Sequence, residues 1–229
     1  RGFPKELGQR PDNVVTGSRP GLPSPPPPSV NWTLKAALFT EAFWWINITS
    51  FCHGFLVNML IVHQAVHIVD AGFSQILAAS CLGTVGLLGS LGGILFGYVS
   101  DRAGKRPAIK TGCAASFAGV TLLLFLHDTH SHGILYASTI LYGLGQASFS
   151  PVYVSAMGDF FPGSSLGRIM STLSISYGLG GAISSYMAGA FYDHMGTYLI
   201  PFLLLLASIF IGALGIWLAT RRKSTSSGI

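Results

Sequence analysis

A glycine-rich apolar stretch covers residues 86–105 and reads Gly86-Leu-Leu-Gly-Ser-Leu-Gly-Gly-Ile-Leu-Phe-Gly-Tyr-Val-Ser-Asp-Arg-Ala-Gly-Lys105. A second stretch aligns with it without a gap and reads Gly178-Leu-Gly-Gly-Ala-Ile-Ser-Ser-Tyr-Met-Ala-Gly-Ala-Phe-Tyr-Asp-His-Met-Gly-Thr197. The matched positions are Gly86 with Gly178, Leu87 with Leu179, Gly89 with Gly181, Gly97 with Gly189, Asp101 with Asp193 and Gly104 with Gly196. The alignment predicts an internal repeat. Chance likeness is the alternative, because glycine is common in membrane helices.

The chain around these stretches is too apolar for a water-soluble domain. Hydrophobic residues make up 50%, charged residues 9%, and the mean hydropathy is +0.55. Stretches of about 20 apolar residues cross the hydrocarbon of a bilayer. Six such stretches are expected, at residues 36–62, 75–100, 107–126, 133–157, 166–191 and 198–220. The repeat copies end the second and fifth, so they cross in opposite directions, which predicts an all-α membrane protein of two inverted three-helix repeats.

The basic residues predict which ends of these spans face the cytoplasm. Lys and Arg lie before the first span, between the second and third, between the fourth and fifth, and after the sixth, whereas the loops near 67–74, 127–132 and 193–197 contain none. Cytoplasmic loops carry the excess of Lys and Arg in membrane proteins. Both termini are therefore expected in the cytoplasm. This sorting explains the net charge of +5 without a nucleic-acid partner.

The two ends of the chain have no apolar span. Residues 1–35 include the run Pro20-Gly-Leu-Pro-Ser-Pro-Pro-Pro-Pro28, which favours extended conformations and predicts a cytoplasmic linker or tail. Residues 36–220 would form the six-helix unit, and residues 221–229 a second cytoplasmic tail. The chain starts with Arg1, so we expect further residues upstream.

The loop between the second and third spans is the most specific motif, and it reads Gly97-Tyr-Val-Ser-Asp-Arg-Ala-Gly-Lys-Arg106. It resembles the signature loop of the major facilitator superfamily, with Val99 in place of the usual Leu. A helix-end carboxylate beside cationic side chains can hold neighbouring helix ends together and act as a gate. The expected gating residues are Gly97, Asp101, Arg102, Gly104, Lys105, Arg106, Asp159 and Arg168. The alternative is that these charges only set the membrane topology.

The resemblance extends from about residue 34 to residue 220. It includes residues 143–151, the connection 159–168 and residues 189–196, which resemble the C-terminal half of such transporters; residues 62–74 are similar to prokaryotic members, some of them monocarboxylate or oxalate/formate carriers. It implies one half of a twelve-helix transporter in a prokaryotic inner membrane. Its expected partners are the lipid bilayer, a small-molecule substrate, and a missing N-terminal half or a second copy.

Polar residues within the spans are candidates for the substrate cavity. Helical spacing at 100° per residue aligns His53 and Gln64 on the first span, while Tyr142, Gln146 and Tyr153 share a face of the fourth. The complete set of expected cavity residues is His53, Asn58, Gln64, Tyr142, Gln146 and Tyr153. His63 and His67 are expected to be a solvated pair at the external mouth, and since they lack a third ligand no metal site is predicted.

Glu41 is the one acidic residue expected within a span, and it is therefore the candidate for ion or proton coupling. The alternative is that its carboxylate reaches the membrane surface, because Lys35 lies less than two turns away.

The leading hypothesis for function is a secondary carrier that works by alternating access, as a proton-coupled symporter or an exchanger. The resemblance suggests a small organic anion as substrate. No phosphate-binding Gly-rich loop with Gly-Lys-Ser/Thr occurs, so neither ATP hydrolysis nor a cofactor is expected. An intramembrane hydrolase is disfavoured because Ser148 and Ser150 lack a Gly-x-Ser-x-Gly elbow, so we expect no enzyme. A non-transporting assembly or regulatory subunit is the remaining alternative.

Overall fold

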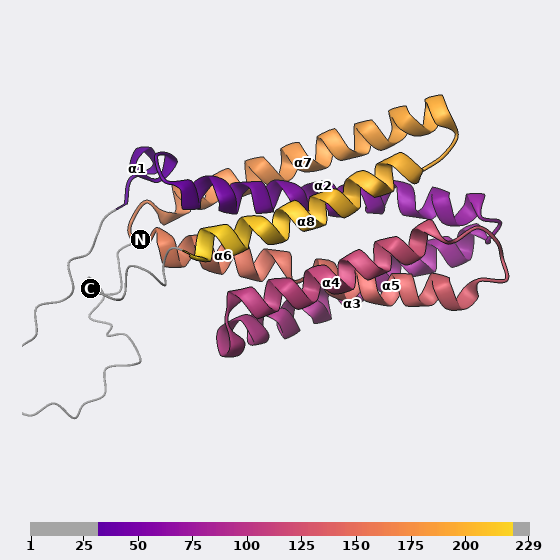
Figure 1. Ribbon diagram of the computed structural model, residues 1–229, viewed down its shortest axis with the longest axis horizontal. Helices are drawn as coiled ribbons and strands as arrows, with labels where there is room; N and C mark the ends of the chain where they lie inside the picture. The colour runs from indigo at the N-terminus through magenta and orange to yellow at the C-terminus, as the bar shows by residue number, and fades with distance from the viewer. Residues whose placement is uncertain (1–31, 222–229) are drawn as a thin grey trace, which may run out of the picture.

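The computed structural model describes residues 32–221, which fold into α-helices that form one elongated bundle (Figure 1). The predicted tails at 1–31 and 222–229 lie outside the described residues. The helices are α1 (Leu34–Leu38), α2 (Glu41–Asp70), α3 (Gln75–Ala103), α4 (Lys105–Leu124), α5 (His132–Gln146), α6 (Phe149–Phe160), α7 (Leu166–Met195) and α8 (Leu199–Arg221). The two described ends of the chain lie at the same end of the bundle (Figure 1).

Four of these helices, α2, α3, α4 and α8, are long and apolar enough to cross a membrane. The α7 helix has 30 residues but contains many Ser and Gly residues, which lower its hydropathy. The expected fourth span consists of two helices, α5 and α6. The all-helical membrane architecture is confirmed, while the arrangement of six spans in two repeats stays a prediction.

The first expected span, residues 36–62, is shifted in the structure. The helix begins at Glu41 because Thr40 caps it, accepting a hydrogen bond from the Phe43 N–H at 3.3 Å. It then continues past the last apolar residue to Asp70, since His63 and Gln64 are buried against other helices. Residues 34–38, which straddle the expected boundary of the tail, form α1, and Trp32 packs edge-on against Phe161.

Close helix packing depends on glycines at the contacts between helices. A Cβ at Gly54 would clash with the Tyr177 carbonyl, and one at Gly180 with the Phe51 carbonyl, so α2 and α7 touch backbone to backbone. Neighbouring glycines on α3 differ in their surroundings. Gly93 has no neighbour within 4 Å of an added Cβ, whereas the close approach to α5 occurs at Gly92.

Candidate functional site

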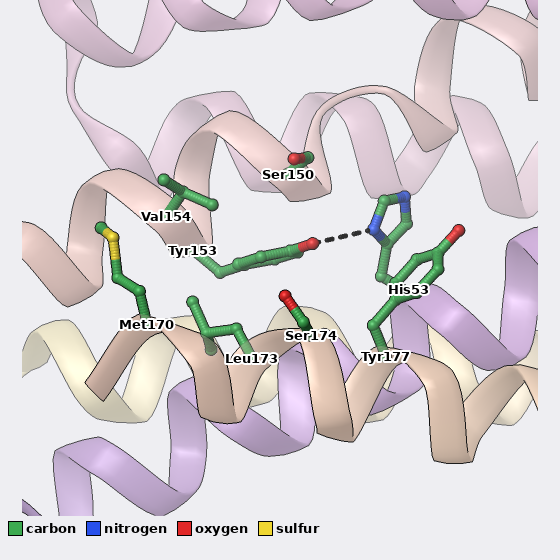
Figure 2. A pocket seen from close by; sticks show the side chains of 8 residues that line it. All are labelled: His53, Ser150, Tyr153, Val154, Met170, Leu173, Ser174 and Tyr177. Carbon is green, nitrogen blue, oxygen red and sulfur yellow. Dashed lines mark hydrogen bonds between the residues drawn. The ribbon is translucent and has the colours of Figure 1, made fainter. Parts of the chain in front are cut away.

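A pocket of about 480 Å³ opens between α2, α6 and α7 (Figure 2). It is lined by His53, Ser150, Tyr153, Val154, Met170, Leu173, Ser174 and Tyr177. The lining contains hydroxyls, one imidazole and apolar groups, and no Lys, Arg, Asp or Glu. A few polar groups on an apolar wall are typical of a site for a small molecule.

His53 contacts both α5 and α6, the two helices into which the expected fourth span is broken. His53 is 6% exposed. Its Nε2 lies 3.5 Å from Gln146 Oε1 at the end of α5, and its Nδ1 lies 3.4 Å from the Tyr153 hydroxyl in α6. Because a carbonyl oxygen only accepts, Nε2 is the donor to Gln146, and the neutral ring accepts from Tyr153 at Nδ1. Figure 2 shows the Tyr153 hydroxyl pointing at the imidazole. Both contacts are long, so a bound solute can compete for them.

Aromatic contacts fix the plane of the His53 ring. It stacks on Phe149 with ring centroids 5.3 Å apart and an interplanar angle of 1°. Tyr177 approaches its edge at 5.4 Å. Phe149 is fully buried at the start of α6, so the broken helix positions the histidine by stacking and by hydrogen bonding.

The break between α5 and α6 places the α6 side chains against the pocket. The Ser148 N–H bonds to the Gly145 carbonyl at 3.1 Å, a tighter turn than an α-helix allows. Pro151 lies in the first turn of α6, where a missing N–H is tolerated. Pro151 therefore lies within α6, and the break occurs just before it.

The expected cavity residues lie in different places. His53 and Tyr153 line the pocket, and Gln146 contacts His53 behind it. The Asn58 amide bonds to the Gly54 carbonyl of its own helix at 3.0 Å. Gln64 is 1% exposed and Tyr142 is buried, and neither lines this pocket.

The contribution of α7 was not foreseen. Met170, Ser174 and Tyr177 recur every three or four residues and therefore form one face of the helix. This spacing was visible in the sequence, but Ser and Tyr side chains in a glycine-rich span were equally compatible with packing. The contact between Gly54 and Tyr177 is what turns this face toward His53.

The signature loop lies at the end of the bundle that holds the described termini. Lys105 forms a salt bridge with Asp159, and so joins the start of α4 to the end of α6. Gly104 separates α3 from α4 with φ of +96°, a conformation that favours glycine. Arg106 Nε donates to Thr220 Oγ1 of α8 at 3.0 Å.

The other expected gating residues form weaker contacts with neighbouring helices. Arg102 lies over the ring of Tyr98, with 5.3 Å between its Cζ and the centroid. Asp101 and Arg168 are exposed, and within residues 32–221 neither side chain forms a salt bridge. A Cβ added at Gly97 would lie 4.0 Å from the Cβ of Pro151 in α6. The gate itself stays a prediction.

Glu41 and the histidine pair also differ from expectation. Glu41 is an exposed first residue of α2 rather than an interior one, and it lines a separate pocket of about 380 Å³. His63 is buried: its Nε2 lies 3.0 Å from the Ser185 carbonyl and its Nδ1 lies 3.1 Å from the Tyr198 hydroxyl. His67 Nε2 donates to the Leu123 carbonyl at 2.9 Å. The solvated pair is therefore wrong for His63, because α7 and Tyr198 enclose it.

Comparisons with known proteins agree with this architecture. The family model described as Major Facilitator Superfamily matches residues 6–138 and, in a second alignment, residues 46–229. Human Protein spinster homolog 3 is 24% identical over 179 residues. The uncharacterized MFS-type transporter YcxA of Bacillus subtilis is 22% identical over 200 residues.

A solved structure shows the same fold. The crystal structure of a mutant of the peptide transporter POT in complex with sulfate superposes with a TM-score of 0.68 at 22% identity, covering 80% of this chain and 38% of that one. The matches cover 75% and 82% of this chain but 33% of the spinster homolog and 48% of YcxA. The chain thus spans half or less of the length of these relatives.

Proposed function

Because the chain belongs to the major facilitator superfamily of membrane transporters, we propose that it is one half of a secondary carrier for a small organic anion. The observation that carries the proposal is the pocket between α2, α6 and α7, where His53, Tyr153 and Tyr177 converge. In such a carrier the second half would close the open side of the pocket. That half is either an N-terminal half of the same protein or a second copy of this chain.

The pocket chemistry favours recognition by hydrogen bonding. The hydroxyls of Ser150, Tyr153, Ser174 and Tyr177 can donate to a carboxylate without a fixed positive charge. Neutral donors bind an anion less tightly than an Arg does, and this suits a carrier, which must also release its substrate. The organic anion itself is suggested by the resemblance to monocarboxylate and oxalate/formate carriers.

Alternating access would use the internal repeat. Gly89 and its repeat partner Gly181 have equivalent surroundings, since an added Cβ would press on the Gln146 amide at 2.6 Å in one case and on the Asn58 amide at 2.5 Å in the other. Matched packing of this kind supports two inverted repeats related by a pseudo-twofold axis. The Lys105–Asp159 salt bridge would then be one closing contact of the gate.

The proposed orientation places the end with Lys105, Arg106 and Lys110 in the cytoplasm of a prokaryotic inner membrane. The excess of basic residues at that end supports it. The same proposal includes that the carrier is either a proton-coupled symporter or an exchanger. Glu41, exposed at this end at the start of α2, is the candidate for the coupling group.

Proteoliposome uptake tests the function. Labelled small carboxylates and neutral solutes would be offered to the chain alone and to the chain joined to the N-terminal half of a related transporter, with and without a pH gradient. We expect carboxylate uptake that Tyr177→Phe reduces and that the exposed-site control Tyr136→Phe leaves unchanged. Loss of gradient dependence in Glu41→Gln would support coupling at Glu41. Correctly inserted protein without uptake in either form would favour the non-transporting subunit.

A further inference from the structure

A second groove lies between α4 and α8, on elements that do not line the solute pocket. Its volume is about 520 Å³. Apolar side chains, among them Ile109, Phe210, Leu214 and Trp217, form most of the wall, and Arg106 and Lys110 are its basic residues. The two helices run side by side in Figure 1, and the groove includes Arg106 of the signature loop.

The groove faces the surroundings of the bundle. Phe210 is 68% exposed and Trp217 is 42% exposed, and both lie on the apolar α8 helix. In a membrane protein such a surface contacts hydrocarbon, so the groove must be filled by apolar chains. Trp217 lies near the C-terminal end of α8, with Arg221 Cζ 5.0 Å from its ring centroid, and this pairing of an aromatic and a basic side chain is typical of the headgroup level.

Arg106 provides the second observation. Its Nε is bonded to Thr220, but its buried Nη2 has no hydrogen-bond partner in the described part of the chain. A buried donor on a charged group is costly when it has no acceptor. The groove lining contains Lys110 as a second cation and no carboxylate. A negatively charged group in the groove would provide the counter-charge that its lining lacks for both cations.

We propose that the groove binds an anionic phospholipid, with one acyl chain between α4 and α8 and the phosphate at Arg106 and Lys110. Basic pockets between helices at one membrane face are suited to anionic headgroups. A free anion would leave the apolar wall unfilled, and a neutral lipid would leave the two cations without a counter-charge. The site is spatially separate from the solute pocket, because it shares no lining residue with the pocket of Figure 2.

Trp217 provides a direct readout of this site. In a variant with Trp32, Trp44 and Trp45 changed to Phe, Trp217 is the remaining tryptophan of the chain. Its fluorescence would be measured in bilayers with brominated phosphatidylglycerol or brominated phosphatidylcholine. Each basic side chain near a membrane surface favours anionic lipid by roughly fivefold. Because the groove holds such basic side chains, we expect its affinity for phosphatidylglycerol to be at least about fivefold higher than its affinity for phosphatidylcholine.

The controls distinguish specific lipid binding in the groove from a general attraction of anionic lipid to surface charge. Arg106→Gln with Lys110→Gln should abolish the preference, and Arg106→Lys should retain most of it. Arg102→Gln with Arg168→Gln removes the same charge from exposed positions outside the groove and should leave the preference intact. Circular dichroism would show that all variants keep their helices. Equal loss in both double variants, no preference in the parent, or displacement by inorganic phosphate would overturn the proposal.

Discussion

At the residue scale, His53 holds the two parts of a broken helix, because Gln146 is the last residue of α5 and Tyr153 lies in α6. His53→Phe keeps an aromatic ring against Phe149 but removes both polar contacts. A solute that competes for both ring nitrogens would lose two hydrogen bonds of about 1 kcal/mol each, so we expect solute affinity to fall roughly thirtyfold while the helices stay folded. Equilibrium binding of the solute in detergent measures this affinity. His130→Phe, in an exposed loop, is the control, and an unchanged affinity in His53→Phe would remove His53 from the site.

The contact of α2 with α7 depends on a second kind of residue. In Gly180→Ala the new methyl group would overlap the Phe51 carbonyl, and α2 would have to move. Overpacking of this kind costs about 1–3 kcal/mol, so we expect a clearly lower Tm. Gly178→Ala is the matched control, because an added Cβ there has no neighbour within 4 Å. Equal Tm values for the two variants would show that the helices do not pack this closely.

Some of the site was predictable from single residues, and some was not. His53 and Tyr153 stood out because polar groups in an apolar span need partners, and both line the pocket. Gln64 carried the same pattern, yet it is buried away from this pocket, because a helix of 30 residues passes several neighbours along its length. Tyr177 was missed because sequence periodicity gives a helix face but not the helix that it meets.

At the element scale, the break between α5 and α6 could be predicted only in part. A proline such as Pro151 favours a bend in a helix, but Ala147 and Ser148, where the break occurs, are not helix-breaking residues. Their turn is explained by tertiary contacts: an added Cβ at Gly145 would clash with Ser116, and one at Gly112 would clash with Ser148. The α4 helix therefore packs against the chain on both sides of the break. This contact between distant parts of the chain cannot be predicted from a single sequence.

The loop between α4 and α5 gives a prediction about pH. Ser131 donates to the Asp128 carboxylate at 2.8 Å and lowers the pKa of Asp128 below its ordinary value, helped by the His130 N–H. A lowered pKa stabilises the folded loop above the ordinary pKa, and this stability is lost as pH falls through the lowered pKa. We expect Ser131→Ala to raise the pKa of Asp128, measured by carboxyl NMR. The same pKa in both proteins would contradict this, and Ser171→Ala is the control.

The Lys105–Asp159 salt bridge joins α4 to α6, and its energy can be measured directly. A double-mutant cycle of Lys105→Ala and Asp159→Ala on thermal stability should give a coupling of about 0.2–1 kcal/mol, because the pair is partly solvated. The coupling should shrink as salt is added. A cycle of Arg102→Ala with Asp159→Ala is the control and should show little coupling. A coupling that salt does not change would argue against an ion pair.

At the scale of the whole molecule, the repeat predicts two equivalent surfaces. Leu91 on α3 and its repeat partner Ile183 on α7 are both exposed, and so are Leu87 and its partner Leu179. These apolar stripes need a cover of lipid or protein. Their matched positions on α3 and α7, of which α7 also lines the solute pocket, are what we expect if another half packs across the open side of this one.

Cysteine cross-linking distinguishes the possible covers. The native Cys52, Cys81 and Cys113 are buried and free, so they should not react. If a second copy is the partner, Leu91→Cys or Ile183→Cys should give disulfide-linked dimers when the chain is expressed alone. The product should disappear when the chain is joined to an N-terminal half, because that half then covers the same stripes. Phe210→Cys, exposed on α8, controls for random collision. Equal cross-linking from α8 would mean that α3 and α7 face lipid, and that the pocket is closed in some other way.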